Sequence, residues 1–126
     1  MNTWSDDDLR RIGNATELQL APRRSDGNLQ SFTTMWVVRV DNDLYVRSAG
    51  GAARPWYRHA LATGNGRIRA RGIETDIVFD EAPADVQVAI DDAYHAKYDR
   101  YGAGPVGHVT GQDAHGVTVR LVRSAP

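Results

Sequence analysis

The residues best suited to chemistry surround a glycine pair, Gly50-Gly51. Arg47 and Ser48 precede the pair, and Arg54 and Pro55 follow it where a helical pattern begins. A glycine turn that leads into a helix can bind an anion, because backbone N–H groups point at the ligand and guanidinium groups add positive charge. The segment therefore predicts a site for phosphate or another anion. The alternative is an ordinary strand-to-helix turn with solvated arginines.

Two arginines of the preceding hairpin, Arg39 and Arg47, need partners. The hairpin is otherwise mostly apolar, and a charge in apolar surroundings is costly unless it is paired. Arg47 could contact the anion of the predicted site. It could equally form an ion pair with an acidic residue elsewhere in the fold, and the sequence leaves both interpretations open.

No residues with the spacing of a catalytic or metal site accompany this turn. The chain has no cysteine, which excludes thiol catalysis, zinc-thiolate sites and disulfides. The acidic run 6–8 falls in the first turn of a predicted helix, where carboxylates favour the helix dipole and splay apart. His108 and His115 have no carboxylate at ligand spacing and are predicted to be surface or turn residues. The catalytic residues are therefore unknown, and no metal site is predicted.

Length and charge limit the class of protein. The 126 residues carry 15 basic and 16 acidic side chains, a formal net charge of −1. A single domain over 1–126 is expected. The balanced charge gives no overall field that would attract nucleic acid or a membrane surface. Neither a signal peptide nor an apolar run of about 18 residues is visible, so a cytoplasmic location is expected.

The hydrophobic pattern predicts alternating helices and strands. The expected elements are a helix within 1–14, a strand over 17–21, a hairpin with arms 31–40 and 44–48, a short helix from 55 to the glycine at 64, a hairpin over 67–79, a long helix over 83–101, and strands over 107–110 and 117–123. About seven antiparallel strands with two inserted helices indicate a small β-barrel of α+β type.

The second hairpin has a register that the sequence specifies. With Arg71-Gly72 as a two-residue turn, Arg69 falls opposite Glu74 and Arg67 falls opposite Asp76. Cross-strand pairs of opposite charge stabilise a hairpin. We therefore expect two ion pairs on one face of this hairpin and an apolar opposite face.

Apolar spacing predicts the buried sides of the two inserted helices. On the short helix Trp56, Ala60 and Leu61 are expected to face the core. On the long helix the buried side should hold residues that recur every three or four positions, namely Val86, Ile90, Tyr94, Tyr98 and Tyr101.

A resemblance to a known superfamily rests on motifs spread from residue 24 to about 122. They are the turn Arg24-Ser25-Asp26-Gly27, a hairpin ending in Tyr45-Val46, Gly50-Gly51, the helix start Pro55-Trp56-Tyr57, and a tyrosine-rich helix with Tyr98 and Tyr101. These motifs resemble the deazaflavin-dependent nitroreductases, which belong with the FMN-binding split β-barrels related to pyridoxamine-phosphate oxidases. Within that group the chain looks most like a bacterial family of small uncharacterised proteins, a domain of unknown function.

The resemblance implies a cofactor, a site and an assembly. Arg24, Ser25 and Gly27 match a basic turn that approaches the cofactor phosphate. The glycine pair and Pro55-Trp56-Tyr57 match the turn and helix start of the same site. The resemblance also implies a homodimer with the flavin at the interface, and a split barrel as the form of the predicted β-barrel.

Two hypotheses from different classes follow. In the first, the protein is an oxidoreductase-like protein that binds FMN or a deazaflavin coenzyme. The residues expected to hold the phosphate are Arg24, Ser25, Arg47, Ser48, Gly50, Gly51 and Arg54, with Trp36, Trp56 or Tyr57 against the isoalloxazine. In the second, it is a non-catalytic dimeric β-barrel that binds another small anionic ligand or none, since fold alone does not decide function.

Overall fold

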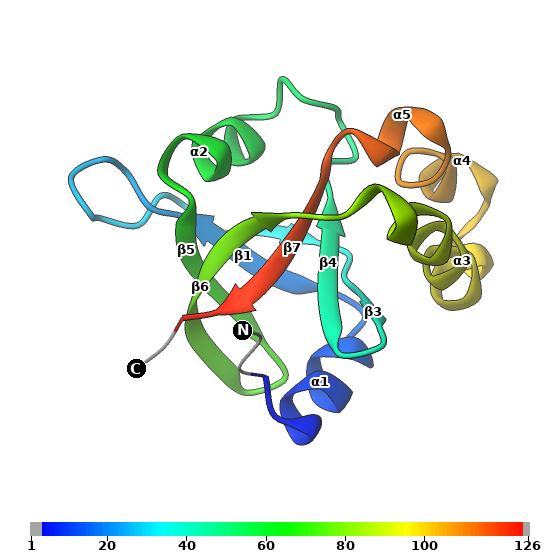
Figure 1. Cartoon of the computed structure of the whole chain (residues 1–126), viewed down its shortest axis with the longest axis horizontal. Coiled ribbons are helices and arrows are strands. Elements are labelled where there is room, and N and C mark those ends of the chain that lie inside the picture. The colour runs from blue at the N-terminus through cyan, green and yellow to red at the C-terminus, as the bar shows by residue number, and fades with distance from the viewer. Residues whose placement is uncertain (1–3, 125–126) are drawn as a thin grey trace.

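The centre of the protein is a sheet of seven antiparallel strands that curls into a half-barrel (Figure 1). The computed structural model describes residues 4–124. The strands are β1 Leu18–Pro22, β2 Thr33–Met35, β3 Val38–Val40, β4 Asp43–Arg47, β5 Asn65–Ala70, β6 Ile73–Glu81 and β7 Thr118–Arg123. Their order in the sheet is β2-β1-β5-β6-β7-β4-β3. The predicted α+β fold with about seven antiparallel strands is confirmed.

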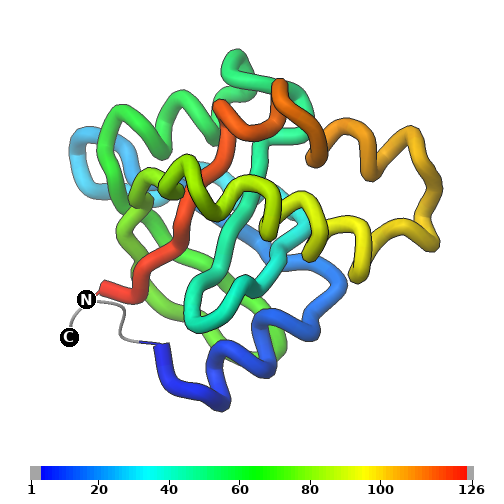
Figure 2. Tube along the Cα trace, turned by 45° about the vertical axis from the view of Figure 1, so that its right-hand side comes forward, coloured from blue at the N-terminus to red at the C-terminus, as the bar shows by residue number. Residues whose placement is uncertain are grey.

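Five helices surround the sheet. They are α1 Asp6–Gly13, α2 Pro55–Thr63, α3 Gln87–Tyr98, α4 Ala103–Gly107 and α5 Gln112–His115, and 3-10 turns over Ala84–Val86 and Asp99–Tyr101 extend α3 at both ends. The helical stretch 84–101 confirms the predicted long helix. It runs along the outside of the sheet and packs against β3 (Figure 2).

Local sequence signals explain the helix boundaries. At α1 the Ser5 hydroxyl accepts a hydrogen bond from the Asp8 N–H at 3.0 Å, as expected for an N-cap. At α2, Pro55 occupies the first turn, and Gly64 ends the helix in the left-handed region at φ 75°, where glycine lacks the Cβ that disfavours this conformation.

The predicted strand over 107–110 is wrong, because that segment ends α4 and then turns toward α5. Val106 and Val109 are both buried, and their spacing of three places them on one side of a helical turn. Gly102, at φ 104°, turns the chain before α4 begins. Val106 and Val109 therefore belong to a short helix and the turn after it rather than to a strand.

The predicted continuous strand over 31–40 is also wrong. β2 pairs with β1, whereas β3 pairs with β4, so the two pieces occupy opposite ends of the sheet order. Residues 36 and 37 join them. The Tyr98 hydroxyl holds this junction, since it accepts from the Val37 N–H at 3.1 Å and donates to the Thr16 carbonyl at 2.7 Å. The two edges of the curled sheet therefore approach each other at residues 36–37.

The alternation of β4 divides the core into two parts. Leu44 and Val46 pack inside the half-barrel, while Tyr45 packs outward against α3. Side chains of the inner cluster include Leu18, Leu20, Val37, Ile68, Ile77 and Leu121, and those of the outer cluster include Val38, Ile90, Tyr94, Tyr98 and Val106.

Two predicted core contacts of the helices need correction. Ala60 is buried and Trp56 packs against the inner cluster, as expected. Leu61, however, is 61% exposed and Tyr101 is 44% exposed. Tyr57 takes the place expected of Leu61, because α2 turns its Tyr57 and Ala60 side toward the sheet.

The β5–β6 hairpin has the predicted register, with Arg69 opposite Glu74 and Arg67 opposite Asp76. The ion pairs differ from the prediction. Arg67 contacts both Glu74 and Asp76, each at 3.0 Å, while Arg69 lies 3.7 Å above the ring of Phe32. The Phe32 ring, which lies in a neighbouring loop, attracts the Arg69 cation. The register of the hairpin alone could not predict this partner.

Candidate functional site

A pocket of about 630 Å³ opens beside the predicted glycine turn. Its walls come from β2 and the junction after it, from the loop 49–54, from the start of α2 and from the segment around α4. The residues that bear on function are Met35, Trp36, Gly50, Arg54, Trp56 and His108. We call this hollow the Gly50 pocket.

The turn at the rim of the pocket is held by its own residues. The Ser48 hydroxyl donates to the Gly51 carbonyl at 2.7 Å, and the Gly51 N–H donates to the Ser48 carbonyl at 3.0 Å. Ser48 is buried, and Gly51 has φ 86°, a conformation that side chains other than glycine rarely adopt. Ser48 and Gly51 thus shape the loop and face a smaller adjoining hollow of about 190 Å³.

Gly50 allows Arg54 to fold back over the turn. A Cβ added at Gly50 would lie 1.6 Å from the Arg54 Nε atom, so only glycine leaves room for the guanidinium there. Arg54 also caps α2, whose first turn contains Pro55 and has no side-chain hydrogen bond at its N-cap. The positive end of the helix dipole and the guanidinium therefore lie together at the pocket rim.

Two tryptophans, Trp36 and Trp56, line the same pocket. Trp36 stacks on Tyr98 with ring centroids 4.1 Å apart and an interplanar angle of 6°. Trp56 meets the edge of the Tyr57 ring at 5.7 Å. Tyr57 itself is buried and donates from its hydroxyl to the Gly116 carbonyl at 3.2 Å; burial, then the charge of Glu81, raises its pKa.

Arg47 borders the pocket, but its guanidinium bonds within the protein. Its Nη1 forms an ion pair with the Asp91 carboxylate and donates to the Val109 carbonyl at 2.7 Å. Its Nη2 donates to the Gln87 side-chain oxygen at 2.9 Å, and its Nε donates to the Thr118 hydroxyl at 2.9 Å. The structure thus provides the ion pair that the sequence left open for Arg47.

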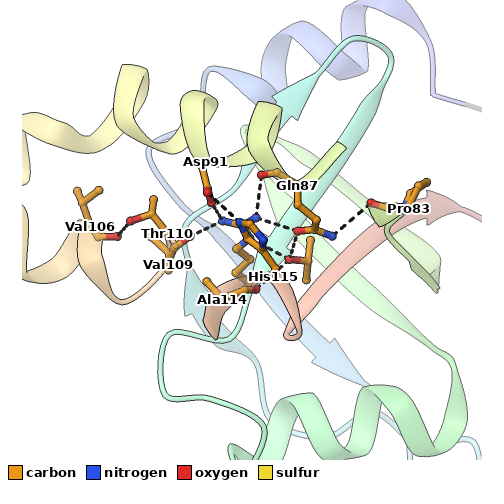
Figure 3. Close-up of polar contacts among 10 residues, drawn as sticks. Pro83, Gln87, Asp91, Val106, Val109, Thr110, Ala114 and His115 are labelled. Atoms are coloured by element: carbon orange, nitrogen blue, oxygen red, sulfur yellow. Dashed lines mark hydrogen bonds and ion pairs between the residues drawn. The ribbon is translucent and has the colours of Figure 1, made fainter. Parts of the chain in front are cut away.

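Asp91 has a second partner, which corrects the prediction for His115. The His115 Nε2 atom lies 2.9 Å from an Asp91 carboxylate oxygen, so this histidine is not isolated from carboxylates (Figure 3). Burial would raise the Asp91 pKa, but the hydrogen bonds from His115 and Arg47 outweigh it and lower the pKa below its ordinary value. The Asp91 carboxylate therefore stays ionised at neutral pH, and its contacts with Arg47 and His115 link α3 to β4 and α5.

Sequence reasoning did not identify Gln87, Asp91 and His108. Gln87 and Asp91 are four residues apart on α3 and so share a helix face, which is the one signal that the sequence offers for them. His108 lines the Gly50 pocket from the end of α4, an element that the sequence did not predict.

Arg24 and Ser25 lie away from this pocket. They belong to the exposed loop between β1 and β2, which projects at the left of Figure 1. The Arg24 N–H donates to the Asn28 carbonyl at 2.7 Å and its carbonyl accepts from the Gly27 N–H at 2.9 Å. Neither side chain lines the Gly50 pocket.

Residues 4–124 offer neither a metal site nor a membrane-spanning helix. No group of three or more histidine or acidic side chains is placed to hold a metal ion in that part of the chain. Nor does it contain a helix of the length and apolarity needed to cross a membrane.

Solved structures show the fold in proteins of several functions. A putative pyridoxamine 5'-phosphate oxidase from Listeria innocua has TM-score 0.66 and 13% identity, covering 95% of this chain and 93% of that one. An F420 reductase has TM-score 0.64 and 17% identity, covering 92% of each chain. The heme storage protein HutZ from Vibrio cholerae has TM-score 0.64 and 14% identity, covering 96% and 91%. At such identities the likeness shows the fold alone.

These neighbours confirm, as a likeness of fold, the resemblance to the split barrels related to pyridoxamine-phosphate oxidases and to an F420 reductase. No curated protein matches the chain significantly. A family model does match, over residues 8–121, which is nearly the whole chain. The protein therefore belongs to DUF2255, a family of uncharacterized proteins conserved in bacteria.

Proposed function

We propose that the protein is an oxidoreductase-like split barrel that binds FMN or a deazaflavin coenzyme in the Gly50 pocket. The observation that carries the proposal is the Arg54 guanidinium, which lies across Gly50 at the rim of a pocket lined by Trp36 and Trp56. Among the residues described, no acidic side chain forms an ion pair with Arg54. A ligand phosphate would supply that missing negative charge.

The residues present fit such a cofactor in size and chemistry. A volume of about 630 Å³ falls within the range of roughly 300–1,000 Å³ usual for small-molecule sites. Arg54 and the uncapped start of α2 would hold the phosphate, and Trp36 and Trp56 would pack against the ring system. When bound, a flavin supplies the hydride chemistry, so the chain needs only to bind and orient it.

The other predicted residues take supporting roles in the proposal. Ser48 and Gly51 fix the turn that carries Arg54. Arg47 lines the pocket while its ion pair with Asp91 holds the end of β4. Arg24 and Ser25 do not line the Gly50 pocket, and in the homodimer that we propose they would contact the cofactor of the neighbouring copy. Sedimentation of the purified protein would measure the assembly. A cytoplasmic location remains part of the proposal.

The test is a titration of the protein with FMN and with the deazaflavin coenzyme, followed by thermal unfolding. A ligand at 100 times its dissociation constant adds about 2.7 kcal/mol of stability. Arg54→Gln should weaken binding roughly tenfold or more, because hydrogen bonds to charged groups contribute about 1.5–3 kcal/mol.

The matched control is Arg58→Gln. Arg58 is exposed one turn further along α2 and lines no part of the Gly50 pocket, so its loss changes the general charge without removing the proposed contact. Binding of neither coenzyme by the unmodified protein would contradict the proposal. So would an Arg54→Gln variant that binds as tightly as Arg58→Gln.

His108 supports a second candidate, a non-catalytic barrel that holds a different anionic ligand, haem. The imidazole lines the same pocket, histidine is a common ligand of haem iron, and one structural neighbour is a heme storage protein. A haemin titration followed by visible absorption would show a shifted Soret band in the unmodified protein and not in His108→Ala. An unshifted band in both would exclude this candidate.

A further inference from the structure

A second hollow of about 460 Å³ lies between α1, β3 and α3, and we call it the Lys97 pocket. It shares no lining residue with the Gly50 pocket. Tyr98 lines the Lys97 pocket and Trp36 lines the Gly50 pocket, and the two rings are stacked, so they form part of the wall between them. The two hollows are therefore separate sites.

The charged side chains of the Lys97 pocket are all basic. They are Arg10 from α1, Arg39 from β3, and Lys97 and Arg100 from the helical stretch 84–101. No aspartate or glutamate lines the hollow. Four cations around one cavity focus a positive potential that attracts small anions.

Three of these cations have uncharged partners. Lys97 Nζ donates to the Val37 carbonyl at 2.7 Å, Arg39 Nε donates to the Asp41 carbonyl at 2.7 Å, and Arg100 donates to the Tyr101 hydroxyl at 3.2 Å. Arg10 alone pairs with a carboxylate, that of Asp7.

Several arginines elsewhere on the protein meet carboxylates, as in the pairs Arg23–Asp76, Arg67–Glu74 and Arg120–Asp80. The Lys97 pocket differs from these pairs because it gathers three cations whose hydrogen-bond partners are uncharged.

Lys97 is the only lysine in the sequence, beside fourteen arginines. Arginine stays protonated in proteins, whereas lysine can lose its proton and then acts as a nucleophile. The Lys97 side chain is half-buried on α3, and burial together with the charge of Arg71 lowers its pKa to about 8. Donation of one N–H to the Val37 carbonyl leaves the lone pair of the neutral amine free.

The groups that face Lys97 come from every neighbouring element. Arg10 on α1 and Arg39 on β3 line the hollow, and Arg71 in the β5–β6 turn is the cation that disfavours a further charge on the amine. Tyr98 has a pKa raised to about 12, chiefly by burial, and so stays neutral. Glu17 acts on Tyr98 from outside the pocket lining, and the Asp7 carboxylate, which also lies outside that lining, pairs with Arg10.

We propose that the Lys97 pocket binds a small aldehyde or ketone that also carries a carboxylate or phosphate, and that Lys97 forms an imine with it. The arginines hold the anionic group while the amine nitrogen attacks the carbonyl carbon. A carbon–nitrogen double bond forms, the carbonyl oxygen leaves as water with the two amine hydrogens, and no oxidant or reductant is required. This site is independent of the proposed flavin site.

The experiment uses glyoxylate, an aldehyde with a carboxylate, and sodium borohydride, which reduces an imine to a stable amine. Peptide mass mapping separates modification of Lys97 from that of the α-amino terminus, since the chain has no other primary amine. At pH 8 a lysine of ordinary pKa is neutral in roughly one molecule in 250, whereas a group with pKa about 8 is half neutral. We expect Lys97 to be modified more than tenfold faster in the folded than in the denatured protein.

A neutral aldehyde, propionaldehyde, measures the role of the arginines. Glyoxylate should react faster than propionaldehyde in the folded protein. Arg39→Gln and Arg100→Gln together should remove that preference while leaving the reaction with propionaldehyde. The controls are Arg58→Gln, which lies outside both pockets, and Arg54→Gln, which tests only the flavin proposal; both should keep the preference. Circular dichroism checks that each variant is folded.

Three results would overturn the proposal. The first is a folded protein in which Lys97 reacts no faster than in the denatured chain. The second is an absence of preference for glyoxylate over propionaldehyde. The third is a preference that survives the double arginine replacement in a folded variant. Because none of these measurements involves a coenzyme, they leave the flavin proposal untouched.

Discussion

At the scale of single residues, Arg47 has a buried guanidinium whose ion pair and hydrogen bonds all lie within the protein. Its side chain has no exposed surface, and Asp91 opposite it is only 19% exposed. Burying a pair of charges gives little net stability, but removing one partner leaves the other charge uncompensated. Arg47 therefore has a structural task whatever the pocket binds, and Arg54 is the better position at which to test ligand binding.

We predict that Arg47→Met lowers the free energy of unfolding by about 3 kcal/mol, the low end of the cost of breaking a buried pair. Adding Asp91→Asn should recover part of the loss, because no unpaired carboxylate then remains. Urea denaturation measures both changes. The control Arg10→Gln breaks an exposed pair with Asp7 and should cost less than about 1 kcal/mol. Equal losses of unfolding free energy in Arg47→Met and Arg10→Gln would contradict the prediction, because the buried pair would then contribute no more than an exposed one.

At the scale of secondary structure elements, the contact between β5 and β1 depends on a missing side chain. A Cβ at Gly66 would lie 2.3 Å from the Ala21 carbonyl oxygen, and that atom belongs to the backbone of the paired strand. Neither strand can move freely, because β5 also pairs with β6 on its other side. Gly66 is therefore required for the spacing of the sheet.

We predict that Gly66→Ala destabilises the protein by about 2 kcal/mol, as overpacking of a core does. Gly116→Ala is the matched control, since a Cβ there meets nothing within 4 Å and no positive φ strains it. Thermal unfolding of the two variants should show a clear loss only at Gly66. A loss of similar size at both positions would attribute the effect to glycine itself rather than to the strand contact.

At the scale of the whole molecule, the curl of the sheet creates both pockets. It brings β2 and β3 close enough for residues 36 and 37 to join them. The Gly50 pocket lies on one side of the stacked Trp36 and Tyr98 rings and the Lys97 pocket on the other. Hydrogen bonds of the Tyr98 hydroxyl to Val37 and Thr16 hold this wall in place.

The stability of the whole molecule should fall at acidic pH. The pKa of Asp91 is lowered in the folded state, as is that of Asp80 through its hydrogen bond to Arg120. A depressed carboxyl pKa means that the unfolded chain binds more protons in acid. The contribution is therefore complete above about pH 5 and disappears as pH falls through the unfolded value near 3.9 toward the lower folded value.

Urea denaturation between neutral pH and pH 3 measures this dependence. Asp91→Asn should flatten the profile below pH 5, because an amide cannot take up the proton. A profile parallel to that of the unmodified protein would mean that Asp91 does not contribute to the acid sensitivity.

The sequence by itself determined the features that depend on near neighbours. The stop at Gly64, the long helix and the register of the β5–β6 hairpin are all as predicted. Each rests on hydrogen bonds or apolar spacing within a few residues, so the local pattern contains the whole cause. The fold class followed from the order of these elements.

Only the tertiary structure decided which residues meet across the chain. The Arg47–Asp91 pair joins residues 44 positions apart, and the His115–Asp91 contact joins residues 24 apart. The break between β2 and β3 and the two separate pockets arise from the curl of the sheet. Such contacts depend on where distant elements pack, and the packing of distant elements leaves no mark in the local periodicity of the sequence. The sequence could therefore point to Arg54 and the glycine turn. It could not point to Lys97 and the arginines around it.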